Sequence, residues 1–369
     1  MTSAGAPEVL LLGGSGDVGT RLTRMLLAQT SARVTTLSRR PAGAGALKSD
    51  RLRHVSLDVA AQRPLEIAPD TIVVNLTEAT PVAVARQVLR AGGWFLETSA
   101  TPDYLGDMAQ GLRDDEGPGG AILCVGAAPG LTNLMVAAIL AATDTTTQID
   151  IGVEMGTGRH YGAGGTEWFL RTAGQTYPIF IDNVPRRVTP GGLTRKFAFR
   201  PKGRPRFALG YGFAEQEFIA KRSQGRLHTV RSFVALDPPW LTRILAWMLA
   251  LGLGPGINRN ARKLARWMGQ VPAFGPKKSR FLVEGFDPTG HLTAQIRLET
   301  GDQAEATAAM ILATVQTLLG ERAAMTGLSM ITDHLDLDGA LQTVRQILPE
   351  TTISARFDPD VPARVDVSP

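Results

Sequence analysis

The chain has 369 residues, 44% of them hydrophobic, and its mean hydropathy is +0.01. It is therefore long enough for two domains of ordinary size, with ample apolar material for a core. Lys and Arg (39) outnumber Asp and Glu (34) only slightly, and the basic residues are scattered. This charge does not favour a nucleic-acid partner, and anionic small molecules explain it equally well. The single cysteine, Cys124, excludes an intrachain disulfide and a CxxC metal site, and no metal is predicted.

The residues before the first predicted strand are small or polar, with no charged stretch followed by an apolar one. This pattern does not indicate a signal peptide, so a cytoplasmic location is the default expectation. Cys124 lies in the apolar run GAILCVGA (120–127), which is typical of a buried strand. We interpret it as a core thiol rather than a nucleophile.

The stretch VLLLGGSGDVGTRLTRMLL (9–27) passes from an apolar run through a glycine-rich turn into a helical pattern. In a dinucleotide-binding fold, Gly14 would permit the tight turn, Gly16 would let the backbone approach a pyrophosphate, and Gly19 would let the helix pack on the strand. The N–H groups at the start of the helix would then face the anion. We predict a dinucleotide site here, against the alternative of a purely structural turn. The predicted contacts are Gly14, Ser15, Gly16, Asp17, Val18 and Gly19.

The end of the second predicted strand indicates which dinucleotide binds. An NAD site usually has Asp or Glu at this point to bind the ribose 2′-OH. Here RVTTLSRR ends in Ser38, Arg39 and Arg40, and no acidic residue occurs between Val18 and Ser49. A hydroxyl and two guanidiniums suit a 2′-phosphate, so we predict NADP(H). The alternative, a solvated charged loop, would leave the missing carboxylate unexplained.

Four further apolar runs, at 53–59, 71–76, 93–99 and 121–127, alternate with helical patterns. This alternation predicts a doubly wound parallel sheet, in which ligands bind at the carboxyl ends of the strands. We therefore expect Asp58 and Val59 near the adenine. Asn75, Leu76 and Thr77 are expected near the nicotinamide ribose.

After the last of these runs the sequence reads GAAPGLTNLMVA (126–137). Together with GGWFLETSATPDYL (92–105) this segment resembles the saccharopine dehydrogenase-like oxidoreductases, specifically over about residues 7–145 and more loosely over 280–355. The resemblance implies a Rossmann domain, a central mixed-sheet domain and NAD(P)-linked hydride transfer, typically at an imine or an amino acid. A Pro-Gly turn opening a helix also exposes free N–H groups, although it is equally common as a purely structural feature. The further predicted cofactor contacts are Thr98, Ser99, Pro129, Gly130, Leu131 and Asn133.

From about residue 144 the pattern changes to strand-like runs joined by Gly/Pro/Asp-rich turns, which predicts a second, sheet-centred α+β domain over 144–300 for substrate binding and dimerisation. The expected runs are 147–156, 177–182, 196–201, 206–212, 217–222, 228–237, 280–286 and 291–299. Residues 301–369 are expected to form C-terminal helices that return to the first domain, which spans 1–143. One of these helices is predicted over 303–319, opened by Asp302 and Glu305 in a capping-box pattern.

The loop within EMGTGRHYGAGGTEWFLRT (154–172) is the second candidate for chemistry. Its glycines let a backbone approach a ligand closely, and a histidine there titrates near neutral pH. We name Glu154, His160 and Tyr161 as catalytic candidates. Trp168 and Arg171 are substrate-contact candidates on the following helix. A lone loop histidine is more often only a surface residue, and that interpretation stays open.

The segment PPWLTRILAWMLALGLGPGI (238–257) is apolar nearly all round and is followed by four cations, Arg259, Arg262, Lys263 and Arg266. Its apolar run is too short to span a bilayer and contains Arg243, so a transmembrane helix is not predicted. A buried lid or a subunit interface is the favoured interpretation, and we expect a homodimer. The alternative is an interfacial helix whose basic flank meets anionic headgroups, which gives a peripheral membrane contact.

Together these patterns predict an α/β chain, with an N-terminal Rossmann domain and a second mixed-sheet domain. The predicted activity is NADP(H)-dependent hydride transfer to or from a C–N or C=O group of a small-molecule substrate. Two alternatives remain open: a membrane-associated reductase of a lipid-like substrate, and a non-catalytic NADP(H)-binding sensor or scaffold.

Overall fold

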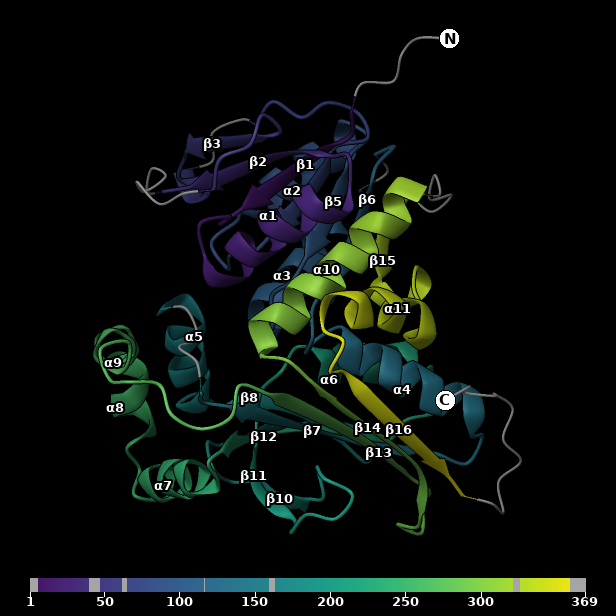
Figure 1. The fold of residues 1–369 in the computed structure, drawn as a ribbon. Helices are drawn as coiled ribbons and strands as arrows, with labels where there is room; N and C mark the ends of the chain where they lie inside the picture. Colours follow the sequence, from purple (N-terminus) through teal and green to yellow (C-terminus); the bar gives the residue numbers. More distant parts are fainter. Residues whose placement is uncertain are drawn as a thin grey trace. The chain divides into compact units, whose positions relative to one another are not determined.

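The computed structural model describes residues 6–39, 47–61, 65–115, 117–158, 163–320 and 326–358 (Figure 1). The chain divides into two compact units. Unit 1 comprises 1–131, 307–335 and 339–344, and unit 2 comprises 132–306, 336–338 and 345–369. The predicted fold class, a Rossmann sheet followed by a mixed-sheet α+β region, is confirmed.

Unit 1 is built on a parallel seven-stranded sheet with the order β15-β6-β5-β4-β1-β2-β3. Its strands are β1 (Glu8–Leu12), β2 (Arg33–Ser38), β3 (Leu52–Ser56), β4 (Ile72–Asn75), β5 (Trp94–Glu97), β6 (Gly120–Leu123) and β15 (Gly327–Met330). Strands β1 and β4 to β6 are almost entirely buried, as expected for a sheet covered on both faces. The order places the topological switch point between β1 and β4, where doubly wound sheets bind their ligands.

Three helices connect the strands of unit 1: α1 (Asp17–Gln29), α2 (Val82–Arg90) and α3 (Pro102–Leu112). Each has an apolar stripe buried in the unit, for example Leu22 and Leu26 of α1. Two later helices, α10 (Gln303–Gly320) and α11 (Leu337–Ile347), contribute residues to both units. Helix α10 ends one residue beyond its predicted end, and the Asp302 carboxylate accepts a 3.0 Å bond from the Glu305 amide at its start.

Unit 2 contains a nine-stranded mixed sheet, whose main path runs β10-β11-β12-β7-β13-β14-β16, with β8 paired to β12 and β9 to β8. Its strands are β7 (Gln148–Gly156), β8 (Tyr177–Ile181), β9 (Val184–Val188), β10 (Thr194–Phe197), β11 (Arg206–Gly210), β12 (Thr229–Asp237), β13 (Ser279–Phe286), β14 (Leu292–Thr300) and β16 (Thr352–Phe357). Its helices are α4 (Leu131–Ala142), α5 (Ala163–Ala173), α6 (Glu215–Arg222), α7 (Pro239–Ala250), α8 (Gly254–Arg259) and α9 (Ala261–Met268).

Two local expectations for unit 2 differ from the structure. The run 217–222, expected as a strand, is helix α6, where Glu217 and Lys221 form an i,i+4 ion pair and Ile219 supplies the buried contact. Strand β9, which forms a hairpin with β8, was not predicted from the sequence. The turn residues of the hairpin, Asp182 and Asn183, both have positive φ, and adjacent Asp/Asn residues are a known signal for such a turn.

The unit boundaries also differ from the predicted ones. The first segment of unit 1 ends at Leu131, whereas the predicted boundary was 143, because the remaining residues of α4 belong to unit 2. The segment 301–369 is not purely helical: β15 joins the parallel sheet beside β6, and β16 forms an edge of the mixed sheet beside β14. A short strand such as GLSM carries too weak a periodicity to be separated from a loop.

Candidate nucleotide-binding and substrate sites

The glycine-rich turn joins the carboxyl end of β1 to α1. Gly13, not Gly14, takes the left-handed conformation that only glycine adopts easily, with φ +83°. Gly14 is needed for space, because a Cβ there would lie 2.7 Å from the Thr36 Cβ of β2. Gly19 packs directly on Gly14, where a Cβ would lie 2.6 Å from its Cα. The close approach at Gly19 is therefore made to the glycine-rich turn after β1 rather than to the strand itself.

The first turn of α1 offers its amides to a ligand. Gly16 is the N-cap residue, and no side chain in the described part of the chain caps the helix there. A Cβ on Gly16 would have one close neighbour, the Gly13 carbonyl oxygen at 3.3 Å, so the other side of this residue is open. Uncapped N–H groups carrying the positive end of the helix dipole are completed by an anion. A diphosphate fits this geometry.

The end of β2 meets the glycine-rich turn. The Ser15 amide donates a 2.9 Å hydrogen bond to the Ser38 hydroxyl, which brings two predicted cofactor residues together. Arg39 is exposed, and its carbonyl oxygen accepts a 3.3 Å bond from Ser56 at the end of β3. Asp58 accepts a 3.1 Å bond from the Ala60 amide in the 3₁₀ turn Val59–Ala61. Arg40 lies outside the described residues.

The ends of β4 and β5 hold a buried polar network centred on Asn75. Its amide nitrogen donates to Glu97 at 2.6 Å and to the Tyr104 hydroxyl at 3.0 Å, and its oxygen accepts a 2.7 Å bond from Thr80. The Thr98 hydroxyl binds the Asn75 carbonyl at 2.6 Å. The Asn75 side chain is therefore fully engaged within the protein. This network fixes the loop after β4, which contains two predicted contacts, Leu76 and Thr77. A Cβ on Gly13 would lie 3.3 Å from the Leu76 carbonyl oxygen.

Glu97 was not among the site residues predicted from the sequence. It is fully buried, and burial raises its pKa to about 7, although three hydrogen bonds to the carboxylate oppose that shift. The Ser99 amide and hydroxyl supply two of these bonds, at 2.8 and 2.6 Å, and Asn75 supplies the third. The sequence does contain a signal for this residue. Glu97 ends an otherwise apolar parallel strand, where burying a carboxylate costs free energy, and this is the edge of the sheet at which ligands bind.

The turn after β6 is tightly built. Ala128–Pro129 is a cis peptide, and Gly130 has φ +135° with its Cα against Gly126, where a Cβ would lie 1.9 Å from the carbonyl oxygen. The Leu131 amide donates a 2.8 Å bond to the same oxygen and starts α4. The Val125 amide binds the Glu97 carbonyl at 2.9 Å, so this turn begins beside the end of β5. Asn133 is buried and belongs to unit 2.

In unit 2, Glu154 lies on a strand, as predicted, and is the centre of a buried ion-pair cluster. It lies on β7, fully buried, with Arg280 of β13 at 2.6 Å and Arg206 of β11 at 3.5 Å. Arg280 also approaches Asp237 at 3.3 Å and Glu299 at 2.5 Å. The cluster joins β7, β11 and β13 through charge-assisted contacts. The other two catalytic candidates, His160 and Tyr161, lie outside the described residues.

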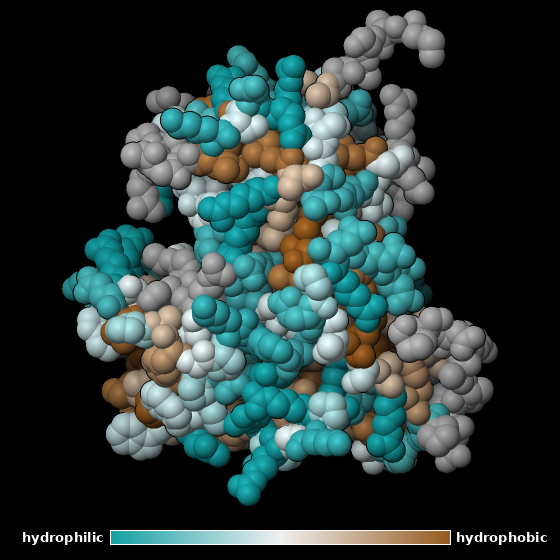
Figure 2. Space-filling model, in the orientation of Figure 1, coloured by the Kyte–Doolittle hydropathy of each residue, from teal (hydrophilic) through white to brown (hydrophobic). Residues whose placement is uncertain are grey.

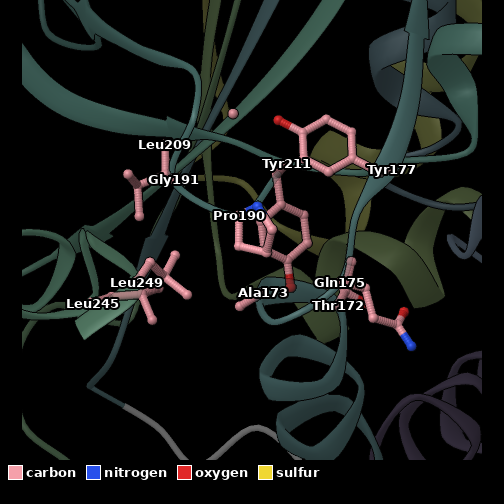
Figure 3. Close-up of a pocket in the computed structure, with 11 residues that line it drawn as sticks. Thr172, Ala173, Gln175, Tyr177, Pro190, Gly191, Leu209, Tyr211, Leu245 and Leu249 are labelled. Carbon is pink, nitrogen blue, oxygen red and sulfur yellow. The ribbon is translucent and has the colours of Figure 1, made fainter. Parts of the chain in front are cut away.

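The substrate-contact candidates stand on α5. Trp168 packs against Tyr211 and Phe213, with ring centroids 5.8 Å apart in both pairs. Arg171 pairs with Glu167 one turn earlier. A small cavity of about 10 Å³ lies between the C-terminal end of this helix and α7 (Figure 3). Figure 3 shows Leu245 and Leu249 of α7 on one side of it and residues that follow α5 on the other. It has room for a water molecule but not for a substrate.

A second buried carboxylate, Glu215 at the start of α6, is also raised in pKa to about 7 by burial. The Thr132 hydroxyl of α4 and the Ser232 hydroxyl of β12 donate to it, the latter at 3.0 Å.

Among the described residues, no cluster of His, Cys, Asp and Glu is arranged to hold a metal ion. None of the helices described is both long and apolar enough to cross a bilayer.

No protein-family model matches the chain, and no curated protein matches it in sequence. The solved structure of apo saccharopine dehydrogenase (L-Glu forming) from Saccharomyces cerevisiae matches it with a TM-score of 0.58 at 13% identity, covering 95% of this chain and 100% of that one. The DAP dehydrogenase of C. glutamicum in complex with DAP has a TM-score of 0.46 at 12% identity, covering 90% and 95% of the two chains.

The chain has the saccharopine dehydrogenase fold. The resemblance predicted from GAAPGLTNLMVA and GGWFLETSATPDYL is confirmed at this level, over nearly the whole length of both chains. At 13% identity the likeness concerns the fold, so the roles of individual residues have to come from the geometry described above.

Proposed function

We propose that the protein is an NADP(H)-dependent oxidoreductase that transfers hydride to or from a carbon bonded to nitrogen or oxygen in a small molecule. The observation that carries this proposal is the uncapped N-terminus of α1, placed behind the Gly13–Gly16 turn at the switch point between β1 and β4. An anion-binding helix end at this position is the diphosphate site of a doubly wound sheet. The bound nicotinamide would supply the hydride acceptor or donor.

Three features near β2 support NADP(H) over NAD(H). The described end of β2 has no carboxylate to receive a ribose 2′-OH, and its last residue, Ser38, is hydrogen-bonded to the diphosphate turn. Arg39 follows directly and is exposed, so its planar guanidinium is available to phosphate oxygens. Arg40 is proposed as a second phosphate contact. The remaining proposed contacts, from Asp58 to Asn133, follow the carboxyl ends of the other strands.

For the transferred proton we retain the loop residues His160 and Tyr161 as candidates. Glu154 fits a positioning role better than proton transfer, because its carboxylate is held 2.6 Å from the Arg280 guanidinium. Trp168 and Arg171 remain proposed substrate contacts on α5. The substrate class we favour is an imine formed from an amine and a carbonyl compound, or the corresponding amino acid oxidised in reverse.

Calorimetric titration with NADPH and NADH tests the cofactor assignment. Gly16→Asp should abolish binding in a folded protein, because a carboxylate would repel the diphosphate at an open position. Gly106→Asp is the matched control: a Cβ at Gly106 of α3 meets nothing within 4 Å, so the same substitution in the same unit should leave affinity unchanged. Unchanged NADPH affinity in folded Gly16→Asp would refute the site.

Turnover separates the enzyme from its alternatives. NADPH oxidation would be followed with a panel of amine and keto-acid pairs and, in parallel, with lipid enones. Turnover of the first panel supports the proposal, and turnover of the second alone replaces it with a reductase of lipid-like substrates. Tight NADPH binding with no turnover in either direction of the reaction would indicate a sensor or scaffold.

A further inference from the structure

Unit 2 exposes a row of large apolar side chains along α7. Residues 240, 244, 247 and 251 recur at the spacing of one helix face, and Trp247 and Leu251 have exposed fractions of 64% and 56%. The opposite face of the same helix buries Leu245 and Leu249, which line the small cavity of Figure 3. Helix α7 is therefore apolar on both faces, and only one face is used by the fold.

The apolar surface continues beyond α7. Trp267 of α9 is 62% exposed, and Trp240 stacks on the exposed Phe274 with ring centroids 5.7 Å apart. We call this surface the α7–α9 patch; its exposed apolar members are Trp240, Ile244, Trp247, Leu251, Leu253, Trp267, Met268 and Phe274. Figure 2 shows hydrophobic residues at the surface at the lower left, where Figure 1 places these helices. Three of the five tryptophans of the chain belong to the patch.

The excess of positive over negative charge is concentrated in the same segment of the chain. Residues 238–278 contain seven Lys and Arg and no Asp or Glu, whereas the rest of the chain contains 32 basic and 34 acidic residues. The net positive charge of the protein thus comes entirely from this segment, which corrects the impression that the basic residues are scattered. Five of the cations lie on α7, α8 and α9 and are exposed: Arg243, Arg259, Arg262, Lys263 and Arg266.

This combination distinguishes between possible occupants of the patch. In a two-fold dimer the same patch would face itself, so a segment with seven cations and no acid would place like charges together; Glu167 beside Arg262 and Glu299 beside Lys278 are acidic partners from outside the segment. A nucleic acid would use the cations and the aromatic rings, but aliphatic side chains such as Ile244 and Leu251 offer its bases no stacking. A bilayer surface uses all three kinds of residue, because tryptophan favours the headgroup region, aliphatic chains enter the acyl boundary and cations meet anionic lipids.

We infer that the α7–α9 patch docks the protein onto an anionic membrane surface. The exposed row of α7 enters the boundary between headgroups and acyl chains, and the cations of α8 and α9 contact the lipid phosphates and carboxylates. The protein rests on the bilayer without crossing it. This inference concerns unit 2 alone and does not depend on the cofactor.

Vesicle flotation with the full-length protein tests it at physiological ionic strength. Vesicles of phosphatidylcholine containing about a third phosphatidylserine should retain the protein at least about tenfold better than pure phosphatidylcholine, and added salt should reduce the difference. Tryptophan emission should shift to the blue on the anionic vesicles only. An unmodified protein that does not bind anionic vesicles would overturn the inference.

Paired variants then locate the contact. Trp247→Ser with Leu251→Ser should abolish vesicle binding, whereas Val184→Ser, at an exposed apolar residue of β9, should not change it. Lys263→Glu with Arg266→Glu should lower partitioning by about 30-fold or more, since each cation contributes roughly fivefold and reversal adds repulsion. The matched control is Arg186→Glu with Arg204→Glu, which makes the same charge change at two exposed residues outside the segment.

Light scattering on the same samples separates the membrane from a second copy of the chain. A dimer that dissociates on Trp247→Ser with Leu251→Ser, in a protein that ignores vesicles, would make the patch a subunit interface and refute the inference. Vesicle binding that survives both patch variants would also refute it, because the contact would then lie elsewhere. Loss of binding in both patch variants, with both controls intact, supports it.

Discussion

The two units hold their buried polar residues in different parts of their sheets. In unit 1 the polar network lies at the carboxyl ends of parallel strands, where Asn75 and Glu97 are the last residues of β4 and β5. In unit 2 the buried polar residues lie along the strands on one sheet face, where Glu154 of β7 is opposite Arg280 of β13. The first arrangement gathers polar groups where a ligand can reach them. The second joins neighbouring strands to one another.

The mixed sheet repeats this device at a second point of β7. Asp150 accepts two bonds from Arg231 of β12, at 2.7 and 2.6 Å, and also pairs with Arg195 of β10. Between the two clusters Gly152 leaves room for an aromatic centre, because a Cβ there would lie 2.8 Å from the Phe197 ring. Along this face of β7, an ion-pair cluster at Asp150 is followed by an aromatic cluster over Gly152 and then by the ion-pair cluster at Glu154. Buried ion pairs of this kind add little net stability, because the desolvation of the charges offsets their attraction, but removing one partner is costly.

The largest expected effect comes from breaking one of these clusters. Arg280→Met should cost about 3 to 5 kcal/mol, because Glu154 and Asp237 would lose their closest shared partner while remaining buried. Denaturant unfolding would measure the loss, with hydrogen exchange assigning it to the strands of unit 2. Adding Glu154→Leu to Arg280→Met should recover part of the stability. A neutral single variant would show that Arg206 and Arg200, which lies 2.5 Å from Asp237, already balance the cluster.

A second prediction compares Glu97 of unit 1 with Glu215 of unit 2. Burial raises the pKa of each to about 7, above the 4.5 of an ordinary glutamate. The folded state therefore keeps a proton that the unfolded state releases between pH 4.5 and 7. Each group leaves stability unaffected below pH 4.5 and lowers it by up to about 3 kcal/mol as the pH rises to 7.

Glutamine substitutions should separate the two sites. Glu97→Gln and Glu215→Gln should each flatten the fall in stability between pH 4.5 and 7, as measured by denaturant unfolding. Glu97→Gln should also carry a pH-independent cost: the Ser99 backbone N–H can only donate, and the Asn75 NH₂ is kept toward residue 97 because the Asn75 oxygen accepts a bond from the Thr77 amide. Glu215 faces two hydroxyls, which can rotate, so its variant should be milder. An unchanged pH profile in both variants would contradict the shifts.

The same contrast explains how far the sequence could be interpreted. In unit 1 the strand order, the glycine-rich turn and the candidate residues around it follow from local patterns, because a parallel sheet brings successive strand ends to one edge. The turn differs in one detail, since Gly13 rather than Gly14 carries the positive φ. In unit 2 the arginine partners of Glu154, Arg206 and Arg280, are 52 and 126 residues away along the chain.

Such distant pairings have no local signal. Glu154 was assigned to chemistry because a glycine-rich loop follows it, yet its surroundings are set by the register of β7 on β13. The α7–α9 patch was predicted from its apolar run and basic flank, and the favoured interpretation of a lid or subunit interface stays a prediction. The exposed fraction of Trp247, 64%, is a property of the packed helix and not of the sequence.

A third prediction tests whether the strand ends of unit 1 serve a ligand. Arg39→Ala should weaken NADPH binding by about 1 to 3 kcal/mol and leave NADH nearly unchanged, because the lost charge-assisted bond involves only the 2′-phosphate. Arg53→Ala, at an exposed arginine of β3, is the control. Calorimetry with both cofactors measures the difference. Equal losses for the two cofactors would make Arg39 a general surface charge.

The smallest effect concerns Ser99, which the sequence assigns to the cofactor and the structure joins to Glu97. Its hydroxyl donates a 2.6 Å bond to the carboxylate, and this bond favours the ionised form. Ser99→Ala should therefore raise the pKa of Glu97 further, by roughly one unit if the bond contributes about 1.5 kcal/mol. Difference infrared spectroscopy of the carboxyl stretch against Glu97→Gln would follow the titration.

NADPH affinity measured on the same Ser99→Ala variant decides between the two roles. If the hydroxyl serves Glu97, affinity at low pH, where the carboxyl is protonated in both proteins, should match that of the unmodified chain. If the hydroxyl binds the cofactor, affinity should fall by a constant factor at every pH while the carboxyl titration stays in place. The second result would extend the ligand-binding edge of the sheet from β1 and β2 to the end of β5.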